Sequence, residues 1–449
     1  MHVRTDIWNQ FGGNPAGSGF RAVQTSERMQ IDWQSPLPAS PGTSSPVIGP
    51  DGTIYVGTLN GRLLAIDPEG GNLKWNVEIA EYHYVVQTPA VADDGTVYCL
   101  CTSTALVHDH RTPRVKGMPS FVISVGSNGV IRWRVPIETL SDLFGTVNCS
   151  LFGAPRILSG PQGSARVIFA LRYELVVSYE EVSGDPESRG PLFVRVLAIV
   201  DESGRFLLFE PYEELKLFVD AHGGGGFDTT AHLGDPPFKE PEPCADTPVV
   251  FGSFPAREPW AIIAAGEKGL YQITWDARES VLVGSPKHFP LAQPFPAPVA
   301  FPNRLLVGLT RVDVTLIDSD TFSKLLPKAT KLGGIATVAG GLRQMYFLFR
   351  YGALFVVDSN GAVPVKNFAL EGKSVAFPAL SANHVHIVTT QGFTKFSLDL
   401  HWSASNNLLF DAPHAGLSSP AIGPSGEVYV VGGPNFAVAP SLFRFTSER

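Results

Sequence analysis

Residues 45–75 read SPVIGPDGTIYVGTLNGRLLAIDPEGGNLKW, and this stretch decides the fold. Turn signals at residues 50–52, 60–61 and 67–71 separate four short segments rich in apolar and β-branched residues. Pro and Gly favour tight turns, and the Asn60-Gly61 pair is the strongest short hairpin signal. The stretch therefore predicts a four-stranded antiparallel meander. A lone small sheet is marginally stable in water, so this unit needs neighbours of its own kind.

The chain supplies these neighbours by repeating the first strand of the unit. Most copies open with Pro before small apolar residues, and one degenerate copy lacks the Pro. The copies lie at residues 45–48, 88–91, 154–157, 247–250, 297–300, 337–339, 377–380 and 419–422. Most are about 40–50 residues apart, the period expected of propeller blades. We therefore predict an all-β, eight-bladed β-propeller of four-stranded antiparallel blades, forming a single domain over residues 29–449.

The two ends of the chain predict how the ring closes. Residues 29–33 resemble the fourth strand of the first blade at 73–75, whereas the last blade ends after its third strand, near residues 441–445. We expect the N-terminal strand to supply the missing fourth strand and remove the open edges. Residues 1–28 precede it and carry two aromatic side chains, so we expect this segment to pack on the propeller.

Composition limits the class of protein. Only 17% of residues are charged, the formal net charge is −8, and no apolar run reaches the length of a transmembrane helix. An acidic chain is poorly suited to nucleic acid, whose phosphates need a basic face. The N-terminal residues show no apolar signal-peptide core. This slightly favours a cytoplasmic location, or a periplasmic or extracellular one if the numbering starts after processing.

The four cysteines form no regular framework. Cys99 and Cys101 are two residues apart on a predicted strand, so they point to the same face and are poorly placed to bond to each other. We expect buried free thiols.

The repeat resembles the PQQ-like (quinoprotein-type) β-propeller family. Its motif is matched by GTIYV at 52–56, GRLLAID at 61–67 and GNLKW at 71–75, and again by GTVY at 95–98 and GVIRW at 129–133. For a catalytic member the resemblance implies a vicinal Cys pair over the quinone, a calcium-binding set and an Asp base. Leu100 separates Cys99 from Cys101, and no such set can be assigned. We therefore expect a non-catalytic member without a cofactor, and predict no catalytic or metal-ligating residue.

Three long segments depart from the repeat. They lie at about 102–120, 180–191 and 210–244. In an up-and-down blade the connection between the second and third strands and the connection to the next blade lie on one face. All three segments fall on that face, on neighbouring blades. Long loops in a compact domain are usually functional, so we expect them to form a raised wall that binds a partner.

Candidate binding residues lie on this predicted face. They are Tyr82, His83, Tyr84, His108, Asp109, His110, Phe227 and Asp228. Residues 82–84 carry aromatics suited to anchoring a partner, or to packing beneath a neighbouring segment. Residues 108–110 have zinc-ligand types, but a solvated polar loop is the expected interpretation because no spaced partner pair is visible. The HGGGGF run at 222–227 resembles an esterase oxyanion loop without the G-x-S-x-G element, and we expect a flexible loop.

His384 and His386 alternate along a strand, which places both imidazoles on one face. The pair could ligate a metal, and a hydrogen-bonded structural pair is the expected alternative.

We expect a non-catalytic interaction scaffold that presents a loop-rich face to a protein partner, as the resemblance to the scaffolding propeller of the outer-membrane assembly machinery implies. Two other functions stay open: a PQQ- or metal-dependent oxidoreductase, and a propeller that binds carbohydrate or another small ligand. The lining of the central axis discriminates among them.

Overall fold

The structure is a computed structural model. It describes residues 8–42, 44–79, 84–103, 120–137, 147–150, 153–159, 164–175, 192–216, 247–251, 259–266, 268–291, 298–300, 305–309, 313–318, 323–324, 330–331, 336–340, 344–349, 353–358, 364–370, 372, 374, 376–398, 408–409, 418–432 and 440–448.

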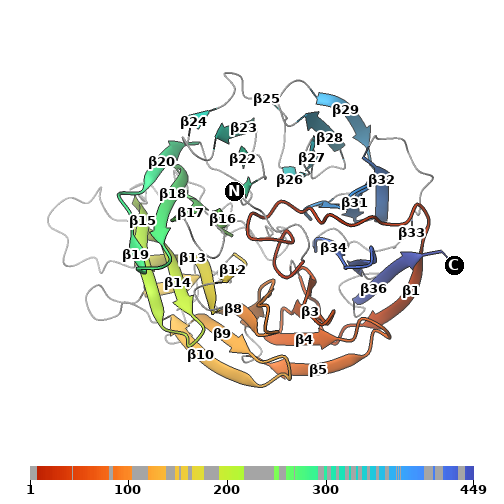
Figure 1. The fold of residues 1–449 in the computed structure, drawn as a ribbon, viewed down its shortest axis with the longest axis horizontal. Helices are drawn as coiled ribbons and strands as arrows, with labels where there is room; N and C mark the ends of the chain where they lie inside the picture. Colours follow the sequence, from red (N-terminus) through yellow and green to blue (C-terminus); the bar gives the residue numbers. More distant parts are fainter. Residues whose placement is uncertain are drawn as a thin grey trace, which may run out of the picture.

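The described strands form eight antiparallel sheets, which follow one another around a ring (Figure 1). Sheet 1 contains β2 (Val47–Ile48), β3 (Ile54–Gly57), β4 (Arg62–Ile66) and β5 (Leu73–Glu78). Sheet 2 contains β6 (Tyr84–Val86), β7 (Ala90–Val91), β8 (Val97–Ser103), β9 (Ser120–Val125) and β10 (Ile131–Ile137). Sheet 3 contains β11 (Val147–Ser150), β12 (Arg156–Ser159), β13 (Ala165–Leu175), β14 (Leu192–Asp201) and β15 (Phe206–Lys216). Sheet 4 contains β16 (Val249–Phe251), β17 (Trp260–Ala265), β18 (Gly269–Asp276), β19 (Val281–Leu282) and β20 (Lys287–Pro290).

The second half of the chain continues the pattern. Sheet 5 contains β21 (Val299–Ala300), β22 (Leu305–Leu309), β23 (Asp313–Asp318), β24 (Ser323–Lys324) and β25 (Thr330–Lys331). Sheet 6 contains β26 (Ala336–Gly340), β27 (Gln344–Phe349), β28 (Ala353–Asp358) and β29 (Pro364–Ala369). Sheet 7 contains β30 (Ala379–Leu380), β31 (His384–Thr389), β32 (Gly392–Ser397) and β33 (Leu408–Leu409). Sheet 8 contains β34 (Ala421–Ile422), β35 (Val428–Gly432), β36 (Ser441–Ser447) and β1 (Met29–Pro36).

The N-terminal strand closes the ring, as the sequence predicted. β1 pairs antiparallel with β36, from Met29 opposite Ser447 to Pro36 opposite Ser441. Sheet 8 thereby joins the two ends of the chain, at the right of Figure 1. This closure leaves β1 in the outer position that β5 holds in sheet 1.

A tryptophan on the outer strand docks each of three sheets onto the next. The Trp33 indole N–H donates to the Pro68 carbonyl oxygen at 3.0 Å, and Trp75 and Trp133 make equivalent bonds one and two sheets further along. The receiving turn contains Gly71 with φ 69°, where a Cβ would lie 2.6 Å from a ring atom of Trp33. Only Gly tolerates both this angle and this approach. Gly71, Gly129 and Gly204 each receive one of these Trp rings. The Gly-x-x-x-Trp spacing at 71–75 and 129–133 supplies two of the receiving Gly residues and two of the docking Trp residues.

Hydroxyl groups before the repeated Pro also link neighbouring sheets. The Ser45 amide N–H donates to Thr88 Oγ1 at 2.9 Å, which joins sheet 1 to sheet 2. Ser419 N–H donates to Ser45 Oγ at 2.9 Å, which joins sheet 8 to sheet 1. Equivalent bonds run from Ala154 N–H to Thr247 Oγ1 and from Phe377 N–H to Ser419 Oγ. The repeated anchors found in the sequence are therefore the inner strands of the sheets and carry contacts between sheets.

Apolar side chains fill the space between sheets. Tyr55 is fully buried and its ring centroid lies 5.6 Å from that of Trp75. Cys99 and Cys101 are free and buried in the same core, which confirms the prediction for these two thiols. Burial raises the pKa of the Cys101 thiol to about 12, so it stays protonated at neutral pH.

The long segments of the sequence lie largely outside the described residues. β8 ends at Ser103 and β9 begins at Ser120, and residues 104–119, 176–191 and 217–246 are not described. β15 reaches Lys216, which lies opposite Leu192 of β14, so the start of the segment predicted at 210–244 is strand. Among the described residues, no helix combines the length and the hydropathy that crossing a bilayer requires.

Candidate functional site

Most of the predicted binding residues lie outside the described residues. Tyr84 begins β6 and lies opposite Ser103 of β8. The others, which the structure does not describe, are Tyr82, His83, His108, Asp109, His110, Phe227 and Asp228. The predicted binding face stays a prediction.

The centre of the ring holds the chain's own N-terminal region. We call residues 8–25 the axial segment, which crosses the middle of the ring in Figure 1 and contacts the inner strands. The amide groups of inner-strand residues donate to its carbonyl oxygens. These bonds are Ile48 to Trp8 at 2.8 Å, Val91 to Asn9 at 2.7 Å, Val250 to Pro15 at 3.0 Å, Gly340 to Ser18 at 2.9 Å and Leu380 to Gly19 at 2.6 Å. One short segment thus binds the inner strands of sheets 1, 2, 4, 6 and 7.

Side chains of the axial segment reach two further sheets. The Gln10 amide oxygen accepts from Ile157 N–H at 3.1 Å in sheet 3. Arg21 Nη1 donates to the Ile422 carbonyl oxygen at 2.6 Å in sheet 8. The segment therefore contacts almost every sheet in the ring.

The glycines of the axial segment let its backbone pass between the strands. Gly12 has φ 67°, and a Cβ there would lie 2.9 Å from Gly17 Cα, so the segment packs tightly against itself. A Cβ on Gly19 would lie 2.8 Å from the Ala339 side chain of sheet 6. Asn14, at 0% exposure, is completely enclosed. The sequence GGNPAGSG is therefore typical of close backbone packing here rather than of a surface linker.

Arg156 of β12 clamps this segment from sheet 3. Its guanidinium is 1% exposed and donates from Nε to the Pro248 carbonyl oxygen at 2.7 Å and from Nη1 to the Asn14 carbonyl oxygen at 3.1 Å. Nη1 also donates to the Phe11 carbonyl oxygen, and the guanidinium lies over the Phe11 ring. A buried charge needs such hydrogen bonds, and here the axial backbone supplies most of them.

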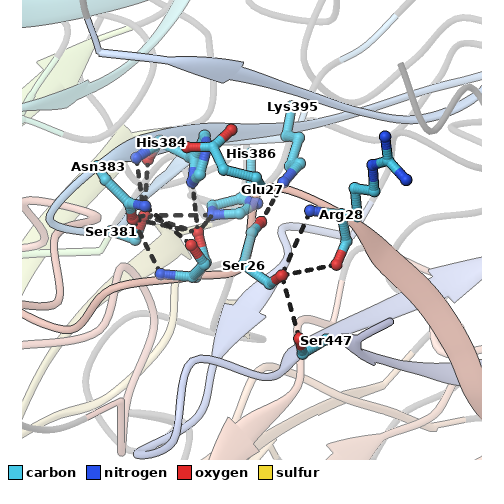
Figure 2. A network of polar contacts seen from close by, with 10 residues as sticks. Ser26, Glu27, Arg28, Ser381, Asn383, His384, His386, Lys395 and Ser447 are labelled. Atoms are coloured by element: carbon cyan, nitrogen blue, oxygen red, sulfur yellow. Dashed lines mark hydrogen bonds and ion pairs between the residues drawn. The ribbon is translucent and has the colours of Figure 1, made fainter. Parts of the chain in front are cut away.

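The segment leaves the centre through a polar network on sheet 7 (Figure 2). Thr25 Oγ1 lies 2.8 Å from His384 Nδ1 and 3.2 Å from His386 Nε2. His384 Nε2 lies 3.2 Å from a Glu27 carboxylate oxygen, and Lys395 Nζ donates to the Ser26 carbonyl oxygen. The two histidines thus form the hydrogen-bonded structural pair expected from their alternation.

Burial dominates the electrostatics of this network. It lowers the pKa of His386 well below its usual value, and the nearby His384 and Lys395 act in the same direction. It also lowers the pKa of Lys395 to about 8, although Glu27 opposes this shift. His386 is therefore neutral at physiological pH.

In the part of the chain that the structure describes, the centre of the ring mainly binds the backbone of the axial segment. The axial segment, WNQFGGNPAGSGFRAVQT, contains no acidic residue and one arginine. Among the described residues, no group of three or more His, Cys, Asp or Glu side chains is placed to hold a metal ion. What the arrangement does is hold a folded Gly-rich segment through main-chain hydrogen bonds from several sheets.

Comparison with known proteins agrees with the fold. A family model described as "Outer membrane protein assembly factor BamB" matches residues 21–115. A europium-containing methanol dehydrogenase is 12% identical over 99% of this chain and 98% of its own, with a TM-score of 0.61. BamB from Moraxella catarrhalis is 11% identical over 94% of this chain and 99% of its own, with a TM-score of 0.43.

The likeness to the methanol dehydrogenase shows a shared fold and nothing about activity. No curated protein matched the chain. The family model covers residues 21–115, and over this part of the chain the Gly-x-x-x-Trp docking and the antiparallel sheets fit PQQ-like β-propeller repeats.

Proposed function

We propose that this chain is an eight-bladed propeller that acts as a non-catalytic interaction scaffold and presents the face with its long segments to a protein partner. Seven sheets made of consecutive strands, and an eighth that joins β34–β36 to β1 and closes the ring, support the blade number. Docking through Trp33, Trp75 and Trp133 holds sheets 8, 1 and 2 onto their neighbours, as a rigid platform requires.

One observation carries the proposal: the axial segment crosses the centre of the ring and is buried there. Small-molecule sites are concave pockets, and in a propeller the central channel is the natural place for one. Here Gln10, Phe11 and Asn14 are all at most 2% exposed between the inner strands. The main-chain N–H groups of the inner strands donate to carbonyl oxygens of the axial segment. A partner is then expected on the outward surfaces.

The test is capture of a partner by the native protein from its own cell lysate. A variant with Tyr82, His83 and Tyr84 all changed to Ala removes aromatics from the proposed face. The matched control changes Glu69 and Glu202 to Ala. Each lies in the turn between the third and fourth strands of its sheet, and we place these turns on the opposite face. Glu69 is 84% exposed and Glu202 is also exposed, so this control removes little packing apart from the 4.0 Å contact of Glu69 with Arg444.

We expect a stoichiometric partner that the control retains and the aromatic variant loses. A partner lost by the control and retained by the aromatic variant would place the interface on the other face. Absence of a partner, together with a stoichiometric quinone or divalent metal in the native protein, would replace the scaffold with an oxidoreductase.

A further inference from the structure

We propose that residues 25–28 form a latch that holds the axial segment in the ring, and that uptake of a proton by His386 opens it and frees residues 8–28 from the inner strands. The inference concerns movement of the chain's own N-terminal region. It does not depend on what the outer faces bind.

The latch crosses from sheet 7 to sheet 8 and is held by polar groups of both (Figure 2). Thr25 contacts the histidine pair, and the Ser26 carbonyl accepts from Lys395. The Arg28 carbonyl oxygen accepts from Glu448 N–H at 3.1 Å at the end of β36. This is the point where the chain passes from the buried centre to the outer strand β1.

The hydrogen-bond partners of Thr25 and His386 bear on the protonation of the latch. The Thr25 hydroxyl has one proton and two acceptor sites, and it lies within reach of His384 Nδ1, His386 Nε2, Ser381 Oγ and Asn383 Oδ1. His386 Nδ1 is buried and has no hydrogen-bond partner among the described residues. Neutral His386 can leave Nδ1 as a bare lone pair. The imidazolium form would bury an N–H without an acceptor, which is unfavourable.

The surroundings of His386 offer little to stabilise a positive charge. Its ring stacks on Phe393 at 5.9 Å, and sheet 8 presents an apolar cluster at this interface. The charged and titratable groups of the network and its margin are His384 of β31, Lys395 of β32, Glu27 and Arg28 of the latch, and Glu448 after β36. Glu27 is the carboxylate in the network, but its side chain is 69% exposed and binds His384 instead.

The sign of the pH effect follows from the lowered pKa of His386, which burial causes with help from His384 and Lys395. A histidine whose pKa is lowered in the closed latch stabilises that state fully above its ordinary pKa, near 6.5. This stabilisation is lost as the pH falls below that value, because the open state takes up the proton.

Burial lowers the pKa of Lys395 to about 8, so neutral Lys395 also stabilises the closed latch at high pH. This contribution is lost as the pH falls from the ordinary lysine pKa of 10.5 to about 8. It therefore adds no pH dependence below pH 7. His384 behaves differently, because a proton on His384 would strengthen its contact with Glu27.

Hydrogen–deuterium exchange of the full chain at pH 7.5, 6.5 and 5.5 tests the latch, after correction for the intrinsic pH dependence of exchange. Peptides from residues 8–28 report the latch, and peptides from β3 and β8 report global unfolding. For one proton, we expect protection of residues 8–28 to fall by up to about ten-fold per pH unit below 6.5. Protection of β3 and β8 should stay constant.

Three variants complete the test. His386→Phe keeps a ring against Phe393 but cannot titrate, so protection of residues 8–28 should become independent of pH. His384→Gln should retain the pH dependence, and so should His288→Phe, which removes an exposed histidine stacked on Tyr271 outside the network. Equal protection at pH 7.5 and 5.5, parallel loss in β3 and β8, or an unchanged slope in His386→Phe would each overturn the proposal.

Discussion

Changing Thr88 to Val should show how much the hydroxyl links between sheets contribute to stability. Thr88 Oγ1 accepts the Ser45 amide N–H at 2.9 Å, and the two residues are 0% and 3% exposed. Valine has nearly the same shape but no acceptor. The variant therefore leaves a buried N–H without this bond, at a cost of about 1–3 kcal/mol in the free energy of unfolding.

The size of the chain decides how this loss is measured. Unfolding entropy of about 2.1 cal/mol/K per residue, over 449 residues, gives about 0.9 kcal/mol/K for the whole ring. The expected loss then lowers Tm by about 1–3 °C if the ring unfolds as one unit. Scanning calorimetry resolves such a shift, and amide exchange of Ser45 reports the lost bond directly.

Thr88→Ser is the matched control, because it keeps the hydroxyl and removes only a methyl group. A buried methyl contributes about 0.8 kcal/mol, so this variant should be less destabilised than Thr88→Val and should retain protection of the Ser45 amide. Equal Tm values for the two variants, with equal exchange at Ser45, would refute the role assigned to the hydroxyl.

Two further changes test other contacts. Gly71→Ala combines a strained positive φ with a Cβ 2.6 Å from the Trp33 ring, whereas Gly284→Ala has a similar φ, 73°, and nothing within 4 Å. The first should therefore lower Tm more than the second, which should cost only about 1 kcal/mol, and calorimetry showing equal losses would contradict the docking. Burial raises the pKa of the Asp94 carboxyl, but hydrogen bonds from Thr96 outweigh it and leave that pKa below its usual value. A lowered carboxyl pKa stabilises the fold above the ordinary value of 3.8, and this stabilisation is lost as the pH falls through the folded pKa. Thr96→Val removes the 2.7 Å bond from its hydroxyl and should move the Asp94 pKa upward toward 3.8, so that Asp94 contributes less of the stability that is lost in acid. Carboxyl-carbon NMR titration measures this, and an unchanged midpoint would count against the assignment.

The blade pattern was predictable because its signals are local. The Asn60-Gly61 pair and the Gly-x-x-x-Trp spacing fix turns and strands within a few residues of themselves. The closing strand was also predictable, since Trp33 repeats the position of Trp75. The structure confirms it through the pairing of β1 with β36.

The role of the axial segment could not be read from the sequence. Its Gly, Asn and Ser residues have no strand or helix period, and such composition usually indicates an exposed loop. The signal present was the pair Trp8 and Phe11, which indicated packing but not a place in the centre. The contact of Thr25 with His384 joins residues 359 positions apart, and no local pattern predicts such a pair.

Ring closure by β1 sets a time order on folding. Arg444 of β36 bonds Asp32 of β1 across 412 residues, so β1 waits for its partner until those residues have been made. At a synthesis rate of about 5–20 residues per second, that wait is roughly 20–80 s. Throughout it the nascent chain carries a strand with no sheet and a Gly-rich segment with no ring around it, both open to wrong pairing. Any product that stops short of β36 keeps that open edge permanently, which marks incomplete chains as aggregation-prone.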